Sequence, residues 1–60
     1  MPSPVRFAVV RKLLESKGYR LIRVRGSHHR FAKPGCPSVT IPVHHGQVVY
    51  VYYRQAEEAP

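Results

Sequence analysis

The sequence contains no aspartate, no asparagine and no tryptophan, and only three of its 60 residues are acidic. The three carboxylates, Glu15, Glu57 and Glu58, lie toward the two ends of the chain. A two-metal nuclease needs several carboxylates around its cations, and hydrolysis by paired carboxylates needs two at one site. The scarcity of acidic residues therefore argues against both chemistries. A glycine-rich phosphate-binding loop is missing as well, which argues against nucleotide-dependent chemistry.

Cysteine and long apolar runs are equally scarce. Cys36 is the single cysteine, so no intramolecular disulfide can form. The longest uninterrupted apolar run, residues 48–53, is far shorter than the ~20 residues that span a bilayer. Basic residues interrupt the N-terminal apolar stretch, so it does not match a signal peptide. We therefore expect a cytoplasmic protein with no membrane partner.

The chain is strongly basic. Ten Lys and Arg residues against three acids give a formal net charge of +7, and residues 16–56 contain no carboxylate side chain. Such a field favours a polyanion, most simply nucleic acid, because basic residues neutralise phosphates and release counterions. An acidic protein partner is the second interpretation, and a purely solubilising role is the third. The basic residues inside this segment include Arg20, Arg23, Arg25, Arg30, Lys33 and Arg54.

The length allows one domain over residues 1–60 with no linker. Residues 3–18 predict a helix in which Ser3 is the N-cap, Pro4 takes the first helical position and Gly18 ends the helix. The expected apolar face of this helix consists of Val5, Ala8, Val9, Lys12 and Leu13, widened by Val10 and Leu14.

Three strands are predicted after this helix, over residues 19–25, 28–33 and 38–43, with Gly26 and Ser27 as the first turn. Pro42 cannot donate to a ladder, which indicates an edge or a strand end. Residues 47–53 fit either a strand or a helix, and we favour a helix from about Tyr50. The predicted fold class is α+β. It is a small α-β-β-β-α domain with a three-stranded antiparallel sheet and helices on one face.

The segment RVRGSHHRF, residues 23–31, gathers arginines and adjacent imidazoles around a turn. RNA carries its own nucleophile, the 2′-hydroxyl, so cleaving its backbone requires neither a metal nor a bound water. It requires a group that titrates near neutrality, and cations or N–H donors beside the phosphate. A Ser-His-acid triad lacks a plausible acid, and a Cys36-His pair depends on one thiol close to two prolines. With these alternatives disfavoured, cleavage of RNA by a histidine side chain is the chemistry that the sequence favours.

Strand geometry limits how these residues can cooperate. Strict alternation places Arg23 and Arg25 on one face and Arg20 on the other, and it places His28 and His29 on opposite faces. At most one histidine of the pair therefore works beside a given group, and the sequence leaves open which one. Zinc binding by His28, His29, His44 and His45 is an alternative, but structural zinc sites usually include cysteine or closed tetrahedral spacing. We expect neither a metal nor a small-molecule cofactor. The tyrosines at 50, 52 and 53 are either base-stacking or packing residues.

The chain also resembles the HicA-type mRNA interferase toxins. The resemblance covers roughly residues 5–58 and rests on an N-terminal amphipathic helix, GYRLIRVRGSHHRF, VTIPVHHG and a final helix containing RQ. Its most specific parts are Gly26-Ser27-His28 and IPVHHG at residues 41–46. The resemblance implies a fold similar to a double-stranded-RNA-binding domain, endoribonuclease activity on translated mRNA, and neutralisation by a HicB-type antitoxin. The catalytic histidine of the family falls on His28, its glycine on Gly26, and a secondary histidine on His44.

Three hypotheses follow. The leading hypothesis is a metal-independent endoribonuclease toxin in which His28 moves the proton and Gly26 and Ser27 support it. The second is a non-catalytic basic RNA-binding module, and the third is a protein-interaction domain that docks on an acidic partner. The expected RNA-binding residues are Arg23, Arg25, His29, Arg30 and Lys33.

Overall fold

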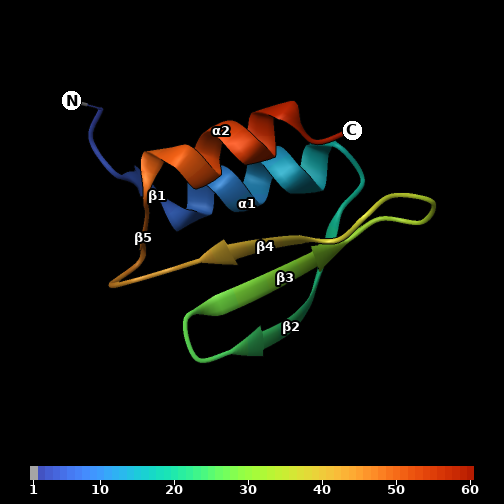
Figure 1. Ribbon diagram of the computed structural model, residues 1–60, viewed down its shortest axis with the longest axis horizontal. Helices are drawn as coiled ribbons and strands as arrows, with labels where there is room; N and C mark the ends of the chain where they lie inside the picture. The colour runs from blue at the N-terminus through green and yellow to red at the C-terminus, as the bar shows by residue number, and fades with distance from the viewer. Residues whose placement is uncertain (1) are drawn as a thin grey trace.

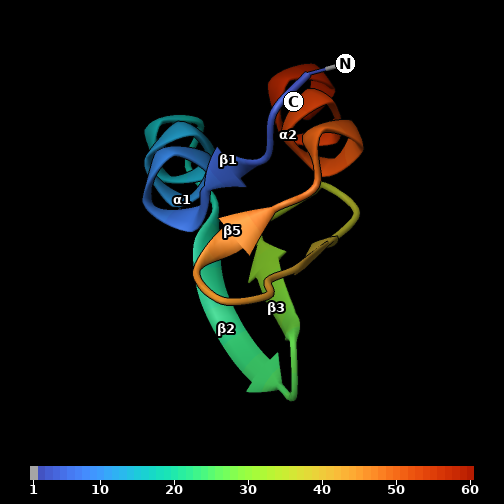
Figure 2. The same cartoon turned by 90° about the vertical axis from the view of Figure 1, so that its left-hand side faces the viewer.

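The structure, a computed structural model, describes residues 2–60 as two helices and five short strands. Helices α1 and α2 lie side by side over the same face of a three-stranded antiparallel sheet (Figures 1 and 2). The predicted α+β class, with both helices on one face, is therefore confirmed. No helix among residues 2–60 is long and apolar enough to cross a bilayer. The elements are β1 (Val5–Arg6), α1 (Phe7–Ser16), β2 (Arg20–Arg25), β3 (His28–Ala32), β4 (Val39–Pro42), β5 (Gln47–Val48) and α2 (Tyr50–Glu58).

The N-terminal residues form a strand where a helical turn was predicted. Val5 pairs with Val48, and Arg6 pairs with Gln47, so β1 and β5 form a small antiparallel ribbon. Helix α1 consequently begins at Phe7, and no side chain caps its N-terminus. The assignment of Ser3 as N-cap was wrong because pairing with β5 satisfies this stretch of backbone and helps to bury Val48 completely.

The apolar face predicted for the first helix was wrong in part, since Val5 and Leu13 pack against the core as expected. Ala8, Val9 and Lys12 are exposed, whereas Val10 and Leu14 are fully buried. With the helix starting at Phe7, the inward stripe follows positions i, i+3 and i+7 from that residue. The residues that form the core are Val10, Leu14, Tyr19, Phe31, Ile41, Val48 and Ala56.

The predicted end of α1 at Gly18 is confirmed. Gly18 has φ 94°, which is the left-handed region that glycine adopts readily. Its N–H donates to the Glu15 carbonyl and the Tyr19 N–H donates to the Leu14 carbonyl, both at 3.0 Å. These two bonds form a Schellman motif, which satisfies the last carbonyls and delivers Tyr19 into the core.

The second helix begins at Tyr50, as predicted, after a tight hairpin that joins β4 to β5. His45 and Gly46 occupy the two turn positions with φ 53° and 74°, the pattern of a type I′ turn. His44 and Gln47 exchange both backbone hydrogen bonds at 2.9 Å across this turn. Pro42 is the last residue of β4, which is an edge strand, in agreement with its predicted place.

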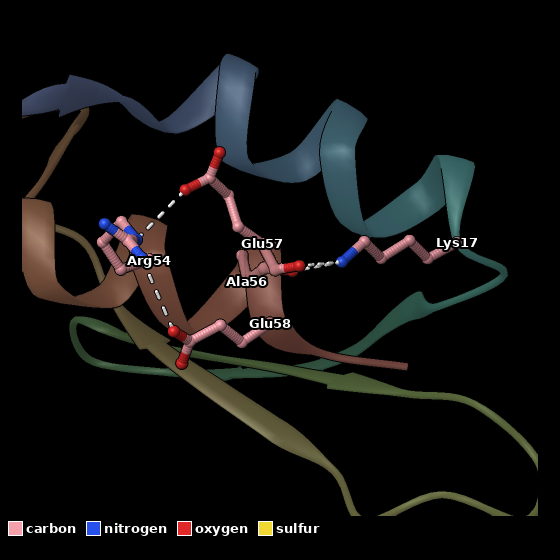
Figure 3. A network of polar contacts seen from close by, with 5 residues as sticks. All are labelled: Lys17, Arg54, Ala56, Glu57 and Glu58. Atoms are coloured by element: carbon pink, nitrogen blue, oxygen red, sulfur yellow. Dashed lines mark hydrogen bonds and ion pairs between the residues drawn. The ribbon is translucent and has the colours of Figure 1, made fainter.

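Lys17 ties the end of α2 to the end of α1. Its ammonium donates to the carbonyl oxygens of Ala56 and Glu57 (Figure 3) and to that of Ala59, at the end of α2 where carbonyls lack the hydrogen bonds of the helix interior. A cation at this position also complements the negative end of the helix dipole. The contact holds the two helices together above the sheet.

Candidate nucleic-acid interface

The face of the sheet turned away from the helices holds a basic hollow. Arg25 lies directly opposite His28, and Arg23 lies opposite Arg30, across the β2–β3 ladder. Directly opposed residues share a face, so all four side chains belong to the side opposite buried Phe31. The hollow has a volume of about 180 Å³ and is lined by Arg23, Arg25, His28, Arg30 and Thr40.

The position of Arg20 corrects a sequence-based prediction. The register of β2 against β3 shifts between Leu21 and Arg23, so Ile22 is an extra residue in the strand. Arg20 then pairs with Ala32, two residues beyond Arg30, and lies on the same face as Arg23. Alternation alone placed Arg20 on the opposite face, and it failed because a bulge inserts one residue without a partner.

The two adjacent histidines lie on opposite faces, as predicted. His28 is exposed and lines the basic hollow. His29 is half-buried on the helix side, where its ring centroid is 4.7 Å from that of Phe7. Its Nδ1 is 3.1 Å from the Ser27 carbonyl oxygen. The structure therefore identifies His28 as the histidine beside the arginines.

A two-residue turn sets the position of His28. Gly26 has φ 57° and is followed by Ser27 at the second turn position, the pattern of a type II′ hairpin. Because φ is positive at the first position, a residue with a side chain is strained there. Gly26 and Ser27 thus form the turn that directly precedes His28.

Ser38 and Thr40 were not identified from the sequence. Ser38 Oγ accepts hydrogen bonds from Nε and Nη2 of Arg30, at 3.2 and 3.0 Å, and so holds the guanidinium against β4. No local pattern in the sequence predicts this contact. Thr40 lies opposite Arg30 on β4. Its position between the apolar residues Val39 and Ile41 could have predicted this, because alternation puts Thr40 on the face of the sheet turned away from the helices, here called the outer face.

Lys33 and His44 lie outside the hollow. The Lys33 ammonium donates to the Pro60 carbonyl at 3.1 Å and lies 5.6 Å from the centroid of the Tyr19 ring. His44 is exposed, and its backbone belongs to the turn between β4 and β5. Neither residue joins the group formed by Arg23, Arg25 and His28.

The acidic residues neutralise helix arginines and leave the sheet arginines uncompensated. Glu15 pairs with Arg11 at 3.1 Å, while Glu57 and Glu58 pair with Arg54 at 3.3 and 3.6 Å (Figure 3). Among the residues that the structure describes, no salt bridge reaches an arginine of β2 or β3. The outer face therefore keeps its full positive charge for an external anion.

Metal binding by the histidines was the alternative considered for the sequence. Over residues 2–60, no group of three or more His, Cys, Asp or Glu side chains is placed to hold a metal ion. His28 and His29 point to opposite sides of the sheet, so they do not converge on one ion.

These features define a small basic α+β protein that presents an imidazole within an arginine cluster on an open sheet face. Residues 8–56 match the family described as HicA toxin of bacterial toxin-antitoxin. The match covers most of the 60-residue chain, so this protein belongs to the HicA toxin family. Comparison with curated proteins and with solved structures gave no match.

Proposed function

We propose that this protein is the toxin of a toxin–antitoxin pair and cleaves mRNA as a metal-independent endoribonuclease. The observation that carries the proposal is the position of His28, an exposed imidazole in a hollow lined by Arg23, Arg25 and Arg30. Family membership supports a toxin role, and a HicB-type antitoxin is the corresponding partner. Because mRNA is the proposed substrate, the site of action would be the cytoplasm.

The proposed reaction uses the 2′-hydroxyl of the substrate as nucleophile. The bond from O2′ to phosphorus forms and the bond from phosphorus to O5′ breaks, which leaves a 2′,3′-cyclic phosphate and a 5′-hydroxyl. The His28 imidazole takes the proton from O2′ and returns it to O5′. Arg23, Arg25 and Arg30 stabilise the charge that grows on the phosphate oxygens. Gly26 and Ser27 hold the imidazole beside this group.

The test is RNA cleavage by purified protein and by a His28→Ala variant. We expect the variant to lose cleavage and toxicity while keeping its circular dichroism spectrum and unfolding transition. His45→Asn, at an exposed histidine outside the hollow, is the matched control and should cleave like the wild type. EDTA should leave the rate unchanged. Full cleavage by His28→Ala would overturn the proposal.

A second candidate is RNA binding without cleavage, which the uncompensated arginines of the outer face also favour. This function predicts salt-sensitive binding with the RNA intact after long incubation, and a His28→Ala variant that binds about as well as the wild type. The third candidate function is docking on an acidic protein partner, and it predicts that the protein has no affinity for RNA. One gel with RNA at two salt concentrations distinguishes the three.

A further inference from the structure

We infer that His29 is a positioning residue that fixes the turn carrying His28. This role rests on the proposed function, because its purpose is to hold the imidazole that moves the proton. Two observations carry the inference. One is the contact of the His29 ring with the Ser27 carbonyl, and the other is the packing of the same ring on Phe7.

The hydrogen bond defines the state of the ring. The Ser27 carbonyl oxygen is only an acceptor, so Nδ1 of His29, 3.1 Å away, must carry the proton and donate it. The same oxygen accepts the Val43 N–H at 2.7 Å. The carbonyl that ends the Gly26-Ser27 turn is therefore held from β3 by a side chain and from the end of β4 by the backbone.

The ring is itself held on the helix side of the sheet. Its centroid lies 4.7 Å from that of Phe7, with an angle of 56° between the ring planes. Val24 and Ile41 are its cross-strand neighbours, and Ile41 is fully buried. A side chain packed in this way loses little further freedom when it makes a hydrogen bond. It provides a fixed donor for the turn.

The turn matters because Ser27 directly precedes His28. The Ser27 carbonyl belongs to the peptide unit that joins the two residues, so its direction constrains the backbone that carries the His28 imidazole. The imidazole must then meet the phosphate held by Arg25 and Arg30. Misplacement of a reacting group by about 1 Å costs on the order of 100-fold in rate. Supporting contacts of this kind decide whether a site is precise enough to work.

Two substitutions separate the donor from the ring. His29→Asn keeps an N–H donor at the same number of bonds from the backbone as Nδ1 but removes the ring. His29→Phe keeps an aromatic ring against Phe7 but removes the donor. We expect His29→Phe to lower kcat by about 10- to 100-fold, with KM unchanged because the arginines stay in place. His29→Asn should retain most of the wild-type kcat, and both variants should keep the native circular dichroism spectrum.

The other kinetic outcomes contradict the inference. Wild-type activity in both variants would show that His29 does not position the turn. An active His29→Phe beside an inactive His29→Asn would assign the effect to ring packing alone. Loss of activity in both variants would show that the donor by itself does not restore the site.

A measurement on the free wild-type protein separates this inference from the proposed function. Nitrogen-15 NMR at neutral pH should report the Nδ1–H tautomer of His29, and the Val43 amide should exchange slowly with solvent. If RNA stays intact but the Nδ1–H tautomer is present, the proposed function fails and the turn contact stands. An Nε2–H tautomer at His29 would overturn the inference whatever the RNA result.

Discussion

Arg25 and His28 face each other directly across the β2–β3 hairpin, at the pair of positions that adjoins the turn. The short turn between them keeps the guanidinium and the imidazole on the same side of the sheet. The same ladder places Arg20 on that face too, but beside Ala32 at the far end of the strand, roughly 15 Å away. Substitutions of Arg25 and Arg20 therefore compare the effect of a positive charge beside His28 with that of a positive charge far from it on the same face.

Arg25→Gln should lower kcat for RNA cleavage by about 10- to 100-fold, because it removes a cation from the phosphate whose charge grows in the transition state. Arg20→Gln removes the same charge from the same face but should leave kcat nearly unchanged. Both variants should lower RNA affinity and reduce the slope of log K against log salt by about one. Single-turnover cleavage and binding titrations at several salt concentrations test these effects. Equal losses of kcat in the two variants would contradict a local role for Arg25.

Lys17→Met should destabilise the fold by about 1–2 kcal/mol, because three carbonyls at the end of α2 lose a charged donor while the aliphatic stem is kept. Urea unfolding monitored by circular dichroism measures this change. Lys12→Met, an exposed position on the same helix, is the control and should change the free energy of unfolding by less than about 0.5 kcal/mol. Similar losses at the two positions would contradict the capping role.

Tyr19 should make the fold sensitive to alkaline pH. Burial raises the pKa of Tyr19 above its ordinary value of 10.0, and the neighbouring Cys36 side chain raises it further. The folded state thus favours the neutral phenol, so this contribution to stability is complete below about pH 10 and is lost as pH rises through the higher folded pKa. Tyr19→Phe should flatten that decline. Because the Tyr19 hydroxyl has no hydrogen-bond partner among residues 2–60, the variant should be at least as stable as the wild type at pH 7. Urea unfolding at pH 7 and above pH 10 tests both statements, and an unchanged alkaline decline would contradict the first.

His45→Asn should raise the free energy of unfolding by about 0.5–1 kcal/mol. His45 holds φ 53° in the type I′ turn, a conformation that strains most side chains and that asparagine tolerates. His45→Val, which branches at Cβ, should be destabilising by a larger amount. Thermal unfolding of the two variants measures the difference. A destabilised His45→Asn would indicate that the imidazole makes a contact that supports the turn.

The sequence was informative wherever structure depends on near neighbours. The glycine turn at Gly26 and the alternation of side chains together placed His28 and His29 on opposite faces. Gly18 marked the end of α1, and the propensity of the last segment placed the start of α2 at Tyr50. Each of these features is decided within a few residues, so the local pattern carries the information.

The errors arose where distant segments meet. Val5 pairs with Val48, which turned an expected helical cap into a strand and rotated the buried stripe of α1. The contact of Arg30 with Ser38 depends on how β3 and β4 come together, and no pattern of spacing reveals it. The bulge at Ile22 follows no recognisable motif in the sequence, so alternation alone misplaces Arg20.

That bulge has a bearing on how such a surface changes over time. An additional residue in a strand that stays fully paired shifts every residue on one side of it to the opposite face, whereas a bulge takes up the additional residue and keeps the alternation of its neighbours. Removing Ile22 would therefore leave Arg20 on the outer face, opposite Ala32, and would only make the ladder regular. A single-codon insertion or deletion at this point of β2 is thus absorbed by the backbone, and the same arginines remain on the outer face.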